Sequence, residues 1–229
     1  MKSKDIRILI INPNSSEAIT KGIQECAEAF ADGDFQVETV SNPTAPEYLH
    51  CYEDRAVAAA GMISIIQANE DKYDAFLIGA HCDPNLDAMK EICSKPVVGM
   101  GESSMKFATL LGHSFSVVSA NLASVQNKYN QINTYYLNGY NASVRAPRES
   151  LASFSQVDIM KQQARLAVEE DLAEVIVLGS GGMCGVAEEM SRELGVPVLD
   201  GIICGLIVAV GMVKAGYTTS KIYRYRGKR

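Results

Sequence analysis

The sequence lacks several patterns that define common classes of protein. Its six cysteines form no Cys-x-x-Cys pair, which argues against a structural zinc site. It has neither the Gly-x-Ser-x-Gly elbow of a serine hydrolase nor the Gly-Lys-Ser/Thr of a phosphate-binding loop. Its longest apolar stretch, residues 201–213, is too short to span a bilayer. The sequence therefore predicts a globular protein without a metal, nucleotide or membrane signature.

An excess of positive charge is also missing, since the formal net charge is −6. A nucleic-acid-binding protein is usually basic, so we expect a small-molecule substrate instead, with no nucleic-acid or membrane partner. The first residues show no signal-peptide pattern, which favours a cytoplasmic protein with mostly reduced cysteines. The basic segment 221–229 is interpreted as a solvated tail, with an anion or membrane contact as the alternative. A homo-oligomer is left open.

Short apolar segments rich in β-branched residues alternate with longer amphipathic segments along the whole chain. This alternation predicts parallel βαβ units and an α/β fold. Strands are expected at residues 6–11, 35–40, 75–78, 96–100, 114–119, 142–145, 175–178 and 197–199. Helices are expected at residues 17–31, 55–68, 86–93, 156–173 and 186–194.

The two halves of the chain resemble each other at an offset of roughly 100–107 residues. The segment from Ala75 to Ala80 resembles the segment from Val175 to Ser180 with Gly79 opposite Gly179, and further on Pro96 stands opposite Pro197. The alternative is that any two βαβ units look alike. We predict two pseudo-symmetric lobes, each a parallel four-stranded sheet flanked by helices. Their expected bounds are residues 1–102 plus 204–229 for lobe 1, and residues 103–203 for lobe 2.

Ligands of parallel sheets bind at the carboxyl ends of the strands, so candidate residues are sought there. The first strand is followed by Asn14, Ser15 and Glu17, and the fifth ends at Ser119. Asn14 and Glu17 have the spacing of a capping box, and free backbone N–H groups at the helix start suit an anion or a ureide carbonyl. Capping alone is the structural alternative.

The third strand of each predicted lobe, at residues 75–78 and 175–178, leads into a loop that contains a cysteine. The first loop holds His81 and Cys82, and the second contains Ser180, Gly181, Gly182, Met183 and Cys184. A thiol near a helix N-terminus has a lowered pKa, and two opposed thiols can act as an acid–base pair at an acidic Cα–H. Packing is the alternative for each cysteine, and packing or exposure for His81. Cys26, Cys51, Cys93 and Cys204 lie away from the expected strand ends and are assigned to packing.

Three groups of residues resemble the hydantoin and allantoin racemases of the aspartate/glutamate/hydantoin racemase superfamily. The first is Asn12-Pro13-Asn14-Ser15-Ser16, the second Asp83-Pro84-Asn85-Leu86, and the third the segment from Val177 to Met183 followed by Pro197-Val198-Leu199-Asp200-Gly201. The resemblance covers almost the whole chain. It implies two four-stranded α/β lobes, a return of the chain to the first lobe after Asp200, and an isomerase without a metal or organic cofactor.

The sequence departs from this family at both usual catalytic cysteine positions, which the resemblance places at Ala80 and Ser180. Cys82 and Cys184 lie two and four residues further on. The leading hypothesis is racemisation at an acidic Cα–H of a cyclic ureide or amino-acid derivative, with Cys82 the more important thiol and Cys184 or Ser180 opposite. The substrate-binding candidates are Asn14, Ser15, His81, Ser119, Gly181, Gly182 and Met183. The alternatives are a one-sided lyase, decarboxylase or hydrolase on the same scaffold, and an inactive small-ligand-binding protein.

Overall fold

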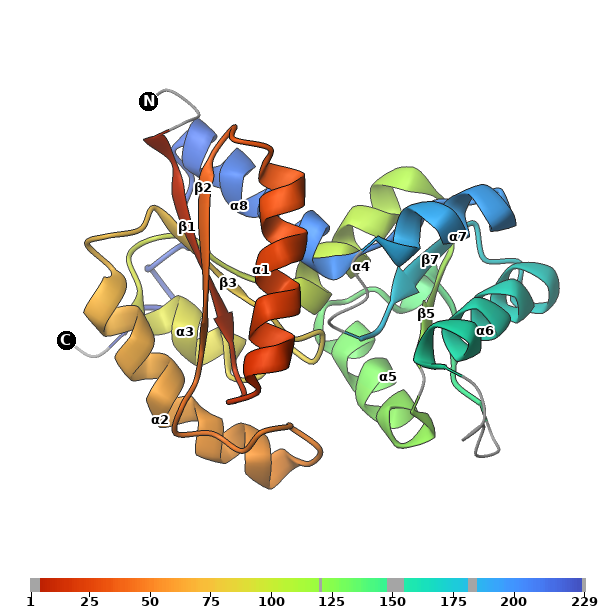
Figure 1. Cartoon of the computed structure of the whole chain (residues 1–229), viewed down its shortest axis with the longest axis horizontal. Helices are drawn as coiled ribbons and strands as arrows, with labels where there is room; N and C mark the ends of the chain where they lie inside the picture. Colours follow the sequence, from red (N-terminus) through yellow and green to blue (C-terminus); the bar gives the residue numbers. More distant parts are fainter. Residues whose placement is uncertain (1–4, 120, 148–154, 181–184, 228–229) are drawn as a thin grey trace. The chain divides into compact units, whose positions relative to one another are not determined.

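The computed structural model describes residues 5–119, 121–147, 155–180 and 185–227. Contacts between residues divide the chain into two compact units (Figure 1). The first consists of Met1–Met100 and Gly205–Arg229, and the second of Gly101–Cys204. No helix among the described residues is long and apolar enough to cross a membrane.

The first unit contains a four-stranded sheet in the order β2-β1-β3-β4, and every neighbouring pair is parallel. The strands are β1 (Arg7–Asn12), β2 (Gln36–Ser41), β3 (Ala75–Ile78) and β4 (Val97–Gly99). Each residue of β3 and β4 is buried, as are five of the six residues of β1. Continuous burial explains why the interiors of these strands are apolar and do not alternate between polar and apolar residues.

Helices cover both faces of this sheet. The helices α2 (Tyr52–Asn69) and α3 (Leu86–Ile92) supply Met62, Ile66 and Met89 to a core that includes Leu9, Ile11, Phe76 and Ile78 from the sheet. On the other face, Ile23 of α1 (Glu17–Ala31) lies near Ile10, and Gly205 of α8 (Gly201–Ala215) lies against Leu77.

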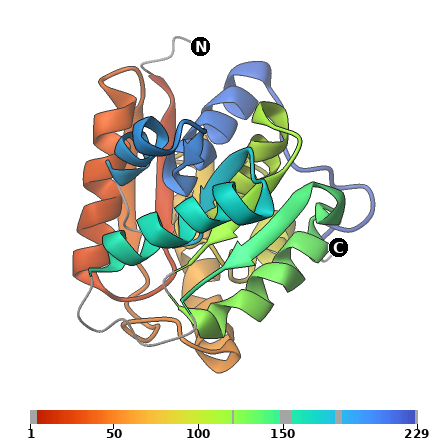
Figure 2. The same cartoon turned by 90° about the vertical axis from the view of Figure 1, so that its right-hand side faces the viewer.

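The second unit repeats this plan with the strand order β6-β5-β7-β8, again entirely parallel. Its strands are β5 (Phe115–Val118), β6 (Asn141–Arg145), β7 (Val175–Leu178) and β8 (Val198–Leu199). The helices α6 (Gln156–Asp171) and α7 (Val186–Leu194) pack on one face, as Figure 2 shows for α6. The other face is covered by α4 (Met100–Leu111) and α5 (Val125–Thr134), and two short 3-10 helices lie at Leu122–Ser124 and Asn138–Tyr140.

The two units exchange one helix each. The α4 helix directly follows β4 of the first unit, but its buried residues Met105 and Ala108 join the core of the second. Conversely, α8 follows β8 of the second unit, and most of its residues belong to the first. The chain therefore crosses between the units twice, and each crossing is made by the helix that follows the last strand of a sheet.

The predicted α/β class with two parallel four-stranded sheets is confirmed, and all eight expected strands are present. Three helices were not predicted: α4, α5 and α8. The α5 helix has no apolar periodicity in its sequence, because only two of its ten residues are buried. The α8 helix is apolar on nearly all sides, so it lacks the polar and apolar alternation that marks a surface helix.

The C-terminal segment, interpreted from the sequence as a solvated tail, is largely exposed, but its basic residues also hold it on α3. The Lys221 ammonium donates hydrogen bonds to the backbone carbonyls of Lys90 and Glu91, at the C-terminal end of α3. Arg224 forms an ion pair of 2.6 Å with Asp87, which also accepts a hydrogen bond of 2.7 Å from the Tyr225 hydroxyl. The basic residues are therefore used to hold the segment on α3, where a cation near the last carbonyls of a helix is stabilising.

Replacing Lys221 with Ala removes the donor to two carbonyls at the end of α3. We expect the free energy of unfolding to fall by about 0.5–1.5 kcal/mol in urea titrations, the usual net value of such hydrogen bonds. Lys214→Ala is the control because Lys214 is exposed in the last turn of α8. Equal stability of the two variants would contradict a structural role for the segment.

Candidate active site

Two consecutive side-chain turns follow the first strand of each unit. In the first unit, the Asn12 side chain accepts a hydrogen bond from the Asn14 N–H (3.3 Å), and the Asn14 side chain accepts one from the Ser16 N–H (2.9 Å). In the second unit, Ser119 Oγ accepts from the Asn121 N–H (3.2 Å), and Asn121 accepts from the Ala123 N–H (2.9 Å). This repetition supports the comparison of these two strand ends made from the sequence.

Asn14 does not cap α1 as predicted. The N-cap residue is Ser16, whose side chain forms no capping hydrogen bond, and α1 begins at Glu17. The carbonyl oxygen of the Asn14 side chain is used inside the turn, where it accepts from Ser16 N and from Asn12 Nδ2 (2.8 Å). No described residue accepts from its amide nitrogen, and the side chain is buried. Asn14 is thus a rigidly held group with a donor to offer.

The backbone N–H groups of the three residues before α1 are already used within the protein, so the anion site predicted at this helix start rests on the first turn of α1 alone. The Ser15 N–H donates to the carbonyl of Pro46 (3.1 Å), and the Asn14 and Ser16 N–H groups are used in the turns described above. Any recognition by Ser15 must come from its partly exposed hydroxyl. Ser119 is also engaged, because its hydroxyl lies 2.7 Å from the hydroxyl of Ser124.

A glycine follows the third strand of each unit at a position where the backbones approach closely. The Gly79 N–H donates to the carbonyl of Ile11 (2.9 Å), and the Gly179 N–H donates to the carbonyl of Val118 (2.8 Å). A Cβ at Gly179 would lie only 2.7 Å from that oxygen, and a Cβ at Gly79 would lie 3.1 Å from Ile10 Cγ2. The space for a side chain is thus absent at Gly179 and tight at Gly79, and the next residue begins the candidate loop.

The loop after β3 places a buried His81 beside a partly exposed Cys82, and both follow the partly exposed Ala80. A turn closes here, since the Asp83 N–H donates to the carbonyl of Ala80 (2.9 Å). The helix α3 begins at Leu86, as expected, with Asn85 as its N-cap. Cys82 therefore lies in a turn and not directly at a helix N-terminus, so the argument for a lowered thiol pKa from that helix does not hold.

The loop after β7 begins with Ser180, which is partly exposed. Its hydroxyl accepts a hydrogen bond of 3.0 Å from the side-chain amide of Gln156, the first residue of α6. Sequence reasoning did not find Gln156, since a glutamine at a helix start carries no functional signal. The remaining candidates of this loop, Gly181, Gly182, Met183 and Cys184, lie outside the described residues.

The four cysteines assigned to packing lie in or beside helices, and three are buried. Burial raises the pKa of the Cys93 thiol to about 11. Burial likewise raises the pKa of the Cys204 thiol to about 12, and the nearby Asp200 carboxylate adds to this effect. Such thiols stay protonated near neutral pH and do not act as bases. Cys51 is exposed at the N-cap of α2, so its assignment to packing is wrong.

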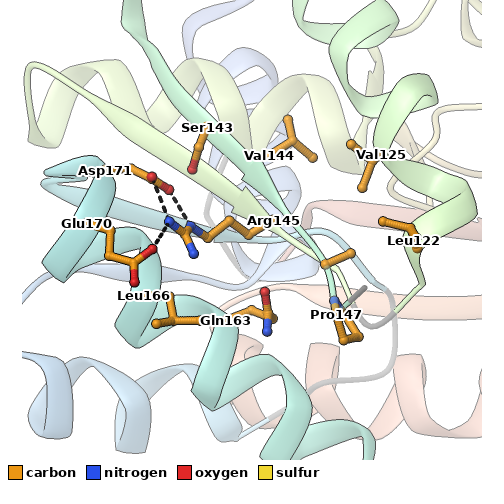
Figure 3. Close-up of a pocket in the computed structure, with 11 residues that line it drawn as sticks. Leu122, Val125, Ser143, Val144, Arg145, Pro147, Gln163, Leu166, Glu170 and Asp171 are labelled. Atoms are coloured by element: carbon orange, nitrogen blue, oxygen red, sulfur yellow. Dashed lines mark hydrogen bonds and ion pairs between the residues drawn. The ribbon is translucent and has the colours of Figure 1, made fainter. Parts of the chain in front are cut away.

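A pocket of about 560 Å³ lies in the second unit, beside β6 and α6, and was not predicted from the sequence. Figure 3 shows the Arg145 side chain along its wall, bound by the carboxylates of Glu170 (2.6 Å) and Asp171 (2.8 Å to Nη2). These ion pairs raise the pKa of Arg145 and lower the pKa of Asp171. None of the predicted site residues lines this pocket.

The described residues contain no group of three or more histidine, cysteine, aspartate or glutamate side chains placed to hold a metal ion. Asp200, at the end of β8, has another role. Its carboxylate accepts hydrogen bonds from the N–H groups of Ile202 (2.7 Å) and Ile203 (3.2 Å), and it thereby caps α8. Burial raises the pKa of this carboxyl, whereas the two backbone hydrogen bonds oppose the rise.

Each unit contains one parallel four-stranded sheet, and the same kind of side-chain turn follows the first strand of each. The protein is therefore an α/β protein built of two similar units. Residues 8–208 match the model of the Asp/Glu/hydantoin racemase family, and the chain belongs to this family. The family resemblance inferred from the sequence is thereby confirmed.

Individual relatives agree with this assignment. The chain is 35% identical to the hydantoin racemase of Pseudomonas sp. (strain NS671) over 228 residues, which covers 96% of this chain and 91% of the relative. Its structure is similar to that of allantoin racemase from Pseudomonas fluorescens, with a TM-score of 0.90, 30% identity and coverage of 98% and 97% of the two chains. Allantoin racemase from Klebsiella pneumoniae gives a TM-score of 0.89 at 29% identity, with coverage of 98% and 94%.

The raised thiol pKa values predict selective alkylation. At pH 8, iodoacetamide should modify the exposed Cys51 within minutes, whereas Cys93 and Cys204 should stay unmodified because little thiolate forms below pKa values of about 11 and 12. Peptide mass spectrometry measures each site. Fast labelling of Cys93 or Cys204 in the folded protein would contradict their assignment to packing.

Gly179→Ala should disturb the strand end, because the new Cβ meets the Val118 carbonyl at 2.7 Å. We expect a loss of about 1–3 kcal/mol in the free energy of unfolding, as for other overpacked positions. Gly139→Ala is the matched control, since a Cβ there meets nothing within 4 Å. Denaturant titration measures the unfolding midpoint of both variants. An unchanged midpoint for Gly179→Ala would contradict the close contact between Gly179 and the Val118 carbonyl.

Proposed function

We propose that this protein is a cofactor-independent isomerase that racemises a small cyclic ureide of the hydantoin or allantoin type, or a related amino-acid derivative. The observation that carries this proposal is the match to hydantoin and allantoin racemases over almost the entire chain, in sequence and in structure. The repeated strand-end turns supply a physical basis, since they provide two comparable sets of polar groups.

The reaction needs a base at Cα and a way to stabilise the enolate that forms. In a cyclic ureide the Cα–H lies next to a ring carbonyl, so the negative charge moves onto that oxygen when the proton leaves. A fixed hydrogen-bond donor at the oxygen stabilises the enolate without reorganisation. The amide nitrogen of Asn14 is such a donor, and the hydroxyls of Ser15 and Ser119 are further polar groups at the strand ends.

In the first unit, Cys82 is our candidate for the proton-transferring group. It is partly exposed, unlike Cys93 and Cys204, and it lies within two residues of Ala80, where the family resemblance places a cysteine. The imidazole of the buried His81 next to it is the second group in this loop that can carry a proton. In the second unit, Ser180 occupies the family cysteine position, and Gly181, Gly182, Met183 and Cys184 complete the proposed set.

A second candidate function is a one-sided reaction on the same scaffold, such as decarboxylation, elimination or ring hydrolysis. The residues at the two family cysteine positions favour it, since neither Ala80 nor Ser180 has a thiol. An inactive binding protein would use the same polar groups without proton transfer. The cytoplasmic location and a homo-oligomeric state remain predictions.

Deuterium exchange at Cα in D₂O separates these functions. The purified protein is incubated with each enantiomer of a 5-alkylhydantoin and of allantoin, and the uncatalysed rate is subtracted. We expect label in both enantiomers together with inversion. Label or product of one configuration alone would favour the one-sided reaction, and the absence of catalysed exchange with every compound would contradict the enzyme.

Cys82→Ala should lower kcat/KM for racemisation by roughly 100-fold or more, the usual contribution of a positioned acid–base group. Cys51→Ala is the control, because Cys51 is exposed at the start of α2 and also carries a thiol. Full activity of Cys82→Ala would remove Cys82 from the mechanism. In the opposite direction, Ala80→Cys with Ser180→Cys should raise the racemisation rate if the family cysteine positions are assigned correctly.

A further inference from the structure

A buried glutamine lines the pocket of the second unit. Gln163 of α6 is only 7% exposed, and it forms part of the wall of the 560 Å³ pocket beside β6, as Figure 3 shows. Among the residues that the structure describes, none forms a hydrogen bond with the amide group of this side chain. A buried amide without a partner is costly, so nearly all such groups in proteins are paired. The donor and the acceptor of Gln163 are therefore available to a ligand in the pocket.

Arg145 adds a second available donor to the same pocket. Its Nη2 atom donates to the carboxylates of Glu170 (2.6 Å) and Asp171 (2.8 Å), and its Nε atom donates to Asp171 as well. No described residue accepts from Nη1, the nitrogen without a dashed line in Figure 3, which points to the side of the pocket where Gln163 and Leu166 lie. Because two carboxylates hold the guanidinium, the N–H groups of Nη1 are fixed before a ligand binds.

The charges of the pocket favour a neutral ligand. One guanidinium binds two carboxylates, so an anionic ligand would meet an excess of negative charge. Both carboxylates are already bound to Arg145, which leaves no separate partner for a cationic ligand. The volume lies in the usual range of small-molecule sites. Most of the remaining wall is apolar and is formed by Leu122, Val125, Val144, Pro147 and Leu166.

The available polar groups suit a ring that contains the sequence –CO–NH–CO–. A glutamine amide donates from its nitrogen and accepts at its oxygen, so Gln163 can pair with an adjacent carbonyl and N–H of such a ring. The Nη1 atom of Arg145 can only donate, so it requires another carbonyl oxygen. A cyclic imide supplies both carbonyls beside one N–H, and a substituent on its ring would lie against the apolar wall.

We propose that this pocket is a binding site for a neutral cyclic imide with an apolar substituent, recognised by Gln163 and by Nη1 of Arg145. None of the candidate residues of the racemase reaction lines the pocket, so the proposal concerns binding alone and does not depend on racemisation. Two classes of compound carry the required –CO–NH–CO– group. One is a 5-substituted hydantoin, and the other is a 5-substituted pyrimidine-2,4-dione.

The test follows the methyl groups of the pocket by NMR, because Val125, Val144 and Leu166 each place one or more methyls in its wall. The full chain, labelled at its leucine and valine methyl carbons, is titrated with 5-benzylhydantoin and, separately, with 5-benzyluracil. We expect these signals to shift and saturate with at least one probe. Saturation with only one probe identifies that class as the ligand, and saturation with both shows that the shared imide suffices. No saturable shift with either probe would overturn the proposal.

A matched pair of variants tests the role of Gln163. Gln163→Leu should weaken binding by about 10-fold or more, because hydrogen bonds to the ligand are lost. The same change should raise the urea midpoint of the ligand-free protein, because an apolar group replaces an unpaired buried amide. Gln162→Leu, at the exposed neighbouring position of α6, should bind as wild type. Wild-type affinity of Gln163→Leu, or a lowered midpoint as expected of a structural glutamine, would overturn the role.

Two modified ligands test the chemistry on the wild-type protein, without a variant that must fold. Methylation of the nitrogen between the two carbonyls of the bound probe removes its N–H, and N-carbamoylphenylalanine carries a carboxylate in place of the closed ring. Each should bind about 10-fold more weakly than the probe, or worse. Equal or tighter binding of either compound would contradict the neutral imide. Racemisation is not measured, so a failure of binding leaves the racemase function standing, and a lack of catalysis leaves the binding site standing.

Discussion

The candidate site depends on one backbone contact that occurs once in each unit. In each unit, the N–H of the glycine after the third strand donates a hydrogen bond to a carbonyl near the end of the first strand. These bonds join Gly79 to Ile11 of β1 and Gly179 to Val118 of β5. Because a side chain at Gly179 would collide with the carbonyl, this contact requires glycine there. It fixes where each third strand ends, and the next residue, Ala80 or Ser180, begins a loop at the same edge of the sheet as the turns at Asn14 and Asn121.

The two units share this framework but carry different chemistry on it. The first unit offers a buried amide at Asn14, a buried imidazole at His81 and a partly exposed thiol at Cys82. In the described part of the second unit, the corresponding edge carries the Ser180 hydroxyl with the buried Lys128 close by. A racemase acts on both faces of a carbon atom, and its two acid–base groups need not be identical. The replacement of thiols at the family positions is therefore compatible with racemisation if other groups carry the protons.

The sequence predicted the eight strands and their division into two sheets because buried parallel strands are short, apolar and regularly spaced. It did not predict α5, whose helix is stabilised by packing of few residues, nor α8, whose apolar surface has no polar face to reveal a helical period. The candidate site itself stays a prediction. The strand-end motifs predicted the positions of Asn14 and Ser180, but the exposed Gln156, which donates to Ser180, was missed because a glutamine at a helix start carries no functional signal. The burial of Lys128 was missed because a polar residue on a polar helix gives no sign of being buried. The cap assigned to Asn14 failed because a side-chain turn competed for the same oxygen.

The central claim is that this protein interconverts the two enantiomers of a cyclic ureide. The most direct measurement is chiral chromatography of a single hydantoin enantiomer incubated with the purified protein, performed separately from the R and the S side. The account predicts that both incubations reach the same equal mixture of enantiomers, at rates well above the uncatalysed reaction and without any other product. Conversion of one enantiomer only, formation of a decarboxylated or ring-opened product, or no change above the uncatalysed rate would contradict it.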